Sequence, residues 1–161
     1  MFPIDAKSQA LLARGNNFDP LPGMGTIIHK TKNCMKAIYD FSVSGGAAST
    51  IPLLDDQGNA AILPTNAIVT NVVCIVLTAV TSGGSATVAL GSNIASATTD
   101  LMAATAKASL ASGFVAGAPV GTAATWVGPV TAQAGSQVQA TIGTAALTAG
   151  KLEYIIEYII Q

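Results

Sequence analysis

Side chains capable of chemistry are few in this chain. The two close carboxylate pairs are Asp55 with Asp56 and Glu153 with Glu157. On a strand, Glu153 and Glu157 would lie about 13 Å apart at ~3.3 Å per residue, too far for the acid and nucleophile of a retaining glycosidase. Asp55 and Asp56 lie in a turn, and no further oxygen ligands follow at the spacing of a calcium loop. Neither pair predicts a catalytic or calcium site.

The lone histidine and the two cysteines do not complete a site either. His29 has no nucleophile and orienting carboxylate beside it in a recognisable arrangement. Together with Cys34 and Cys74 it offers too few ligands for a metal ion. Two thiols in a chain that is not secreted are more often free and buried than bridged, so we expect no disulfide. The sequence therefore predicts no enzyme, no cofactor and no metal.

A basic patch and a single tryptophan are the residues that we expect to contact a partner. The patch lies within Thr26–Lys36 and consists of His29, Lys30, Lys32 and Lys36. It is either a contact for an acidic partner or a solvated strand edge, where lysines discourage unwanted pairing. The edge interpretation is favoured over nucleic-acid binding, because aromatic residues are scarce and no nucleic-acid-binding signature is present. Trp126, flanked by loops, is expected to anchor a core or an interface.

Charge is scarce over most of the chain. Charged residues make up 9% of it, against ~25% in typical domains, and between Gln57 and Gly150 they are only Asp100 and Lys107. Charge keeps protein surfaces soluble and apart, so we expect copies of the chain or a larger assembly to cover much of this surface. The alternative is a neutral surface of Ser, Thr and Gly that is soluble by itself.

Membrane insertion and secretion are not expected. The longest apolar run, Ala67–Val80, is interrupted by polar residues and is shorter than the ~20 residues of a spanning helix. The N-terminus lacks the continuous apolar segment of a signal peptide. We expect a soluble protein made in a cytoplasm, and the net charge of −1 provides no general attraction to nucleic acid or acidic membranes.

The stretch Ile62–Gly91 is the centre of the expected fold. Its long β-branched run, Ala67–Val80, is followed by Gly83-Gly84 and by a second alternating run, Ala86–Leu90. This pattern predicts a strand, a hairpin turn and a returning strand. Both faces of Ala67–Val80 are apolar, so we expect that strand to be covered on both sides.

The remaining pattern predicts an all-β chain with one short helix. The helix is expected over Leu101–Ala111, where alanines are frequent. Further strands are expected at Ala37–Val43, Ser49–Leu54, Gln137–Ile142 and Lys151–Ile160. The count of about seven to nine strands predicts an antiparallel β-sandwich of jelly-roll type with one short helical insertion. Two parts are expected: residues 1–36 as an extended arm with a short helix, and residues 37–161 as the sandwich.

Two stretches resemble a known family. One runs from Leu63-Pro64 through Asn66–Asn71 and the apolar strand to Ala86–Gly91, and the other is Leu147–Tyr158. Together they are similar to the small jelly-roll decoration, or cement, proteins on the heads of tailed bacteriophages. The resemblance covers Ile62 to the C-terminus. It implies a homotrimer, made in the host cytoplasm, that sits on the capsid exterior and clamps the major capsid protein, without catalysis or cofactor.

Another function for a β-sandwich of this kind remains open. The chain could be a head fibre, a tail appendage or a carbohydrate-binding sandwich. Sugar sites usually stack the sugar on exposed aromatic side chains, and Trp126 is the one tryptophan available for this.

Overall fold

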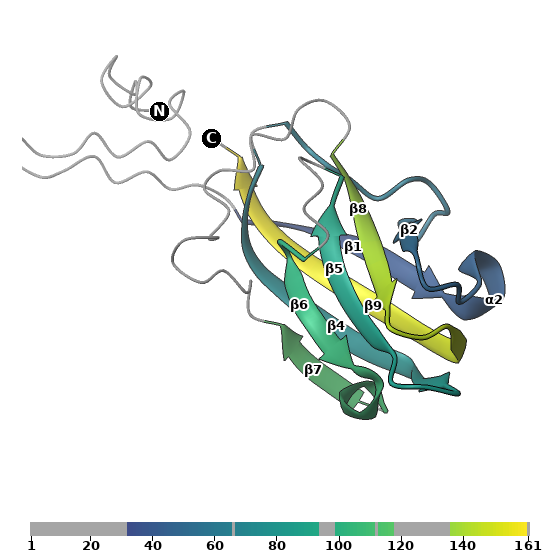
Figure 1. The fold of residues 1–161 in the computed structure, drawn as a ribbon. Helices are drawn as coiled ribbons and strands as arrows, with labels where there is room; N and C mark the ends of the chain where they lie inside the picture. Colours follow the sequence, from purple (N-terminus) through teal and green to yellow (C-terminus); the bar gives the residue numbers. More distant parts are fainter. Residues whose placement is uncertain (1–31, 66, 94–98, 112, 118–135, 161) are drawn as a thin grey trace, which may run out of the picture.

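The computed structural model describes residues 32–65, 67–93, 99–111, 113–117 and 136–160, which form two packed β-sheets (Figure 1). Its helical elements are α2 (Phe41–Ser44) and the 3-10 turn η1 (Lys107–Leu110). The strands are β1 (Asn33–Asp40), β2 (Thr50–Pro52), β3 (Ile62–Leu63), β4 (Ala67–Ser82), β5 (Thr87–Ser92), β6 (Met102–Ala106), β7 (Gly113–Gly117), β8 (Ser136–Gly143) and β9 (Leu147–Ile160).

The strand order is that of a jelly roll. One sheet has the order β1-β9-β4-β7 and the other β2-β8-β5-β6, with the short β3 also paired to β8. All these pairs are antiparallel. Apart from β3 and the step from β5 to β6, which are neighbours in one sheet, the chain alternates between the two sheets in the way that folds eight strands into two Greek keys. The predicted fold class, an antiparallel sandwich of jelly-roll type, is confirmed.

The core lies between the sheets and is built of aliphatic side chains with two tyrosines. Successive side chains of a strand point to opposite faces, so every second residue of the long strands points inward. On β4 and β9 the inward set that is fully or almost fully buried includes Val72, Cys74, Val76, Leu152, Tyr154 and Ile156. Each fully buried Leu, Ile or Val contributes about 1.5–3 kcal/mol relative to an exposed one, which offsets much of the chain's ordering entropy.

The predicted hairpin within Ile62–Gly91 is wrong in its pairing. Both strands form where expected, but β4 pairs with β9 and β7, whereas β5 pairs with β8 and β6. The turn at Gly83-Gly84 therefore carries the chain from one sheet to the other. Two side-chain hydrogen bonds hold the end of β4 in this arrangement. The hydroxyls of Thr81 and Thr148 of β9 are 2.8 Å apart, and Ser82 Oγ donates to the carbonyl of Ala146, just before β9, at 2.6 Å.

The helix expected over Leu101–Ala111 is also wrong. Met102–Ala106 forms β6, which pairs with β5, and the only helical residues there are the single turn η1. Alanine favours a helix by a few tenths of a kcal/mol per residue, and burial of Leu101 and Met102 in the core outweighs that preference. The short helix α2 lies instead at the end of β1.

The first strand begins and ends earlier than expected. It covers Asn33–Asp40, so it starts within the segment assigned to the arm, and residues 1–31 lie outside the described part of the chain. Asp40 ends it by accepting hydrogen bonds from the Ser42 amide and hydroxyl, at 2.9 and 2.6 Å, and so caps α2. Val43, the last residue of the expected strand Ala37–Val43, lies in α2 instead and is 71% exposed.

Candidate interaction surface

Three of the four carboxylates in the two close pairs, Asp55, Glu153 and Glu157, are bound by neighbouring groups. Asp55 Oδ1 accepts hydrogen bonds from the amides of Gln57 and Asn59, which shapes the turn. Glu153 pairs with Lys36 of β1, and Glu157 pairs with Lys32, which immediately precedes β1. Among the described residues no three His, Cys, Asp or Glu side chains could hold a metal ion together, and no helix is long and apolar enough to cross a membrane.

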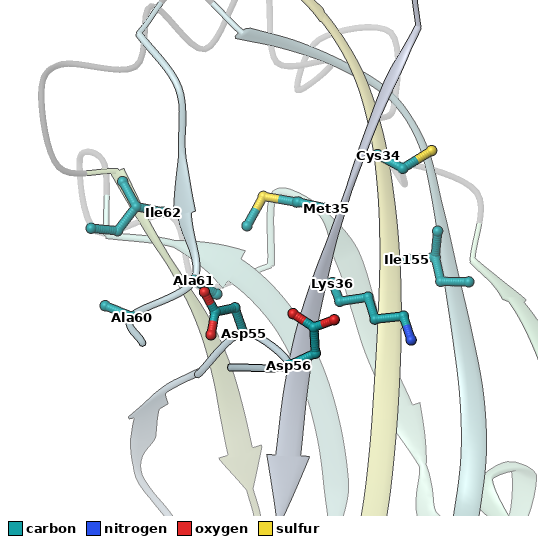
Figure 2. A pocket seen from close by; sticks show the side chains of 9 residues that line it. All are labelled: Cys34, Met35, Lys36, Asp55, Asp56, Ala60, Ala61, Ile62 and Ile155. Carbon is teal, nitrogen blue, oxygen red and sulfur yellow. The ribbon is translucent and has the colours of Figure 1, made fainter. Parts of the chain in front are cut away.

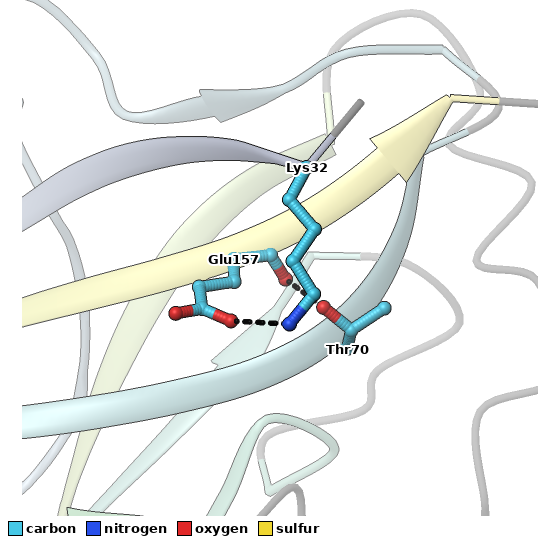
Figure 3. Close-up of polar contacts among 3 residues, drawn as sticks. All are labelled: Lys32, Thr70 and Glu157. Atoms are coloured by element: carbon cyan, nitrogen blue, oxygen red, sulfur yellow. Dashed lines mark hydrogen bonds and ion pairs between the residues drawn. The ribbon is translucent and has the colours of Figure 1, made fainter. Parts of the chain in front are cut away.

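Three ion pairs join β9 to β1 and the residue before it on the outside of the sandwich. They are Lys32–Glu157 at 3.2 Å, Lys36–Glu153 at 3.4 Å and Lys151–Asp40 at 2.8 Å. Figure 3 shows the first, beside the bond from Thr70 Oγ1 to the Glu157 carbonyl. The hydrogen bonds from Lys151 and then Ser42 lower the pKa of Asp40 to about 2. Surface pairs of this kind add about 0–1 kcal/mol each, so they orient side chains more than they stabilise the fold.

The predicted partner-contact residues divide into two groups. Lys32 and Lys36 lie at β1, and both are paired with glutamates of their own chain. His29, Lys30 and Trp126 lie outside the described residues. Trp126 is the aromatic residue on which a sugar site would depend. The partner role of all five residues stays a prediction, and the described lysines do not form a free cationic surface.

The outer face of the four-stranded sheet carries an apolar strip along β4 and β9. Because Val72, Cys74 and Val76 point into the core, the residues between them point outward. In register, Ile68 lies opposite Ile159 and Val73 opposite Ile155. Asn71 and Glu157 lie between these two pairs, and Ile75 lies opposite Glu153, so the strip is bordered and interrupted by the ion-paired glutamates. We call this strip the outer apolar face, and its members are Ile68, Val73, Ile75, Leu77, Ile155 and Ile159.

The outer apolar face is only partly covered by the described chain. Leu77 is 52% exposed, and the other members keep part of their surface accessible. The sequence predicted apolar side chains on both faces of β4, and the structure places one set in the sandwich core and the other on its outside. An apolar strip outside a filled core is typical of an interface with another protein.

A cleft lies beside the edge strand β1. It has a volume of about 580 Å³, and Figure 2 shows side chains from both of its walls. One wall is β1 with Ile155 of β9, and the other is the segment from Asp55 to Ile62. Sequence reasoning missed this cleft, because its walls come from segments that become neighbours only in the folded sheet. Its lining residues are Cys34, Met35, Lys36, Asp55, Asp56, Ala60, Ala61, Ile62 and Ile155.

Both cysteines are free, as expected, although only one is buried. Cys34 is exposed on β1 and Cys74 lies in the core, where burial raises the pKa of its thiol to about 11. The Cys74 thiol therefore stays protonated and unreactive at neutral pH. Cys34 lies on the wall of the cleft and is open to reagents.

Tyr154 has an unsatisfied hydroxyl in the middle of the core. It is fully buried, and its Oη has no hydrogen-bond partner by geometry. The neighbouring Cys74 thiol is at most a weak hydrogen-bonding group. By contrast, the hydroxyl of Tyr39 donates to the Gly45 carbonyl at 2.7 Å. The Tyr154 hydroxyl thus lowers the stability of the fold.

Replacement of Tyr154 by Phe should therefore stabilise the protein. Removing a buried hydroxyl that lacks a partner recovers its desolvation cost, about 1–3 kcal/mol. The free energy of unfolding, measured by urea denaturation, is expected to rise. The matched variant Tyr39→Phe should lower it by about 1 kcal/mol, because it removes a bond that is made. A loss of stability in Tyr154→Phe would show that its hydroxyl has a partner.

Comparison with known proteins places the chain by its fold alone. No protein family model and no curated protein matches the sequence. Among solved structures, the chain is similar to one in the acidic stable capsid structure of Helicobacter pylori bacteriophage KHP30, with 14% identity and a TM-score of 0.49, over 83% of this chain and 90% of that one. It is also similar to one in the capsid asymmetric unit of cyanophage Pam1, with 11% identity and a TM-score of 0.47, over 88% and 94%. Both TM-scores are low, so the assignment to the jelly roll depends on the strand order of this chain itself.

Proposed function

We propose that this protein is a structural protein of a virus particle, and that it decorates a bacteriophage head as a homotrimer. The observation that carries the proposal is the outer apolar face, a strip of aliphatic side chains on the outside of a sandwich whose core is already filled. Burying such a strip against another protein gains about 25 cal/mol per Å² of apolar area.

The fold and the charge distribution support an assembly function. Jelly rolls recur in viral capsid proteins, although the fold alone does not determine function. The described lysines of the basic patch are neutralised within the chain, which argues against a nucleic-acid surface. The long charge-poor segment between Gln57 and Gly150 suits a protein whose surface is covered by neighbours.

The position on the particle follows from the same reasoning. We place the homotrimer on the capsid exterior, in contact with the major capsid protein, after synthesis in the host cytoplasm. A ring of three copies requires a heterologous interface, in which different patches of neighbouring copies meet. The role is structural, and we propose neither catalysis nor a cofactor.

Co-sedimentation with phage heads tests the proposed function. Purified protein is mixed with undecorated heads of its own phage, and bound protein is measured in the pellet over a range of concentrations. Saturable binding is the expected result, with a proportion of three copies per occupied position. Protein that stays entirely in the supernatant would refute the decoration role.

A further inference from the structure

We propose that the free edge of β1 accepts a strand from a second copy of this chain. Residues 26–31 of one copy would add to β1 of the next and occupy the cleft beside it. This inference rests on the homo-oligomer proposed above and names the segment and the surface that would join its copies.

Within the described part of the chain, the backbone of β1 is largely unpaired on one side. β1 is the outermost strand of its sheet, and β9 pairs with it along its whole length on the other side. On the open side, the one described bridge is to Leu54, whose carbonyl accepts from the Ile38 amide at 2.7 Å. In an antiparallel ladder every second residue directs its amide and carbonyl to the same side. Those of Cys34 and Lys36 therefore point to the open side as well.

The lysines that would normally protect this edge are turned away from it. Lysine on an edge strand discourages pairing with another chain, because its charge would have to be covered. Here the ammonium groups of Lys32 and Lys36 are paired with Glu157 and Glu153 on β9, so they lie over the sheet. The open backbone of β1 is thus left accessible to an added strand, as in other proteins that bind an extended peptide at a sheet edge.

The cleft beside β1 has the size and lining that an added strand needs. Its volume of about 580 Å³ lies within the ~300–1,000 Å³ of typical binding pockets. Met35 and Ile62 provide apolar contacts along its walls (Figure 2). Asp55 is engaged by its own turn, whereas no described residue binds the exposed carboxylate of Asp56. An added strand with a basic side chain would pair with that carboxylate.

The segment before β1 has the composition of such a strand. Residues 26–31 read Thr-Ile-Ile-His-Lys-Thr, which combines β-branched residues with the basic pair His29 and Lys30. This segment leads directly into β1, and a strand cannot pair with its own continuation without a turn between them. The edge of β1 therefore receives residues 26–31 from another copy, and repetition of this contact can close a ring.

Cysteine cross-linking in the full-length protein tests the strand exchange, with native Cys34 as the reporter in the cleft. Each residue from 26 to 31 is replaced by Cys in turn, and oxidised glutathione is added. A disulfide needs Cα atoms about 4.4–6.8 Å apart, and successive side chains of a strand point to opposite faces. We expect disulfide-linked dimers and trimers chiefly at the one position that lies directly opposite Cys34, and several-fold less product at the other positions.

Three variants serve as controls. Cys34→Ser should abolish the cross-links, since Cys74 is buried. Lys36→Pro removes the amide that points to the open side and should reduce the cross-link yield at least tenfold, while β1 keeps its bonds to β9. Lys36→Ala also loses the ion pair with Glu153 but keeps the amide, so its yield should match that of the native chain.

The outcomes separate the two proposals. Cross-links at none of the positions, equal yields at all of them, or disulfides within single chains only would overturn the strand exchange. If light scattering nevertheless gives the mass of a trimer, the proposed assembly stands and its copies are joined by another surface. If the protein is a monomer at all concentrations, both proposals fail.

Discussion

Replacement of Leu77 by Lys should weaken the assembly of this protein at least about tenfold. Leu77 belongs to the outer apolar face and is 52% exposed, so a lysine there fits the free chain without disturbing the core. In an assembly the ammonium group would be buried without a partner, and hot-spot losses at interfaces are about 2 kcal/mol or more, where 1.4 kcal/mol is tenfold in affinity. Light scattering at graded concentrations measures the shift from trimer to monomer.

Val43→Lys is the matched control for this prediction. Val43 is also an exposed aliphatic residue, at 71%, but it lies in α2 and not on the outer apolar face. Its replacement should leave the trimer unchanged, and both variants should unfold within about 0.5 kcal/mol of the native chain. If Leu77→Lys assembles as well as Val43→Lys, the outer apolar face is not the contact between copies.

Replacement of Gly46 by Ala should cost about 1–3 kcal/mol of stability. Gly46 lies against the start of β9, where its carbonyl accepts from the Leu147 amide at 2.7 Å. A Cβ added there would lie 2.7 Å from a ring carbon of Phe41 and closer still to the Leu147 carbonyl oxygen. The oxygen belongs to the backbone of β9 and cannot rotate away, so the chain would have to shift, with the cost typical of an overpacked site. Urea denaturation measures the loss.

Gly83→Ala provides the comparison for Gly46→Ala. A Cβ at Gly83 would have no atom within 4 Å, and the change should alter the free energy of unfolding by less than about 0.5 kcal/mol. Equal stabilities of the two variants would mean that β9 can move at Leu147, and that the junction between α2 and β9 is looser than the structure indicates.

The proposed function and the strand exchange place two different surfaces in one assembly. The outer apolar face lies on β4 and β9, and the open edge belongs to β1 of the same sheet. A neighbouring copy could therefore cover the face while its residues 26–31 reach the edge. Leu77→Lys tests the first contact and the cysteine scan tests the second, so the contribution of each surface is measured separately.

The sequence by itself determined the class of the fold and the positions of the longest strands. Alternation of apolar residues is a local signal, and it located the strands that became β4, β8 and β9. These properties depend on each segment alone, which is why they could be predicted.

Only the tertiary structure decided which strands meet. Several strands with the same apolar pattern could pair with β4, and nothing between Ile62 and Gly91 indicated that its partner would be β9 rather than β5. The same uncertainty explains the mistaken helix at Leu101–Ala111, where pairing with β5 overrode the preference of alanine. The ion pairs over β9, the cleft beside β1 and the outer apolar face all follow from these distant pairings. Contacts between segments far apart in the chain are set by the packing of the whole core, and no local pattern encodes them.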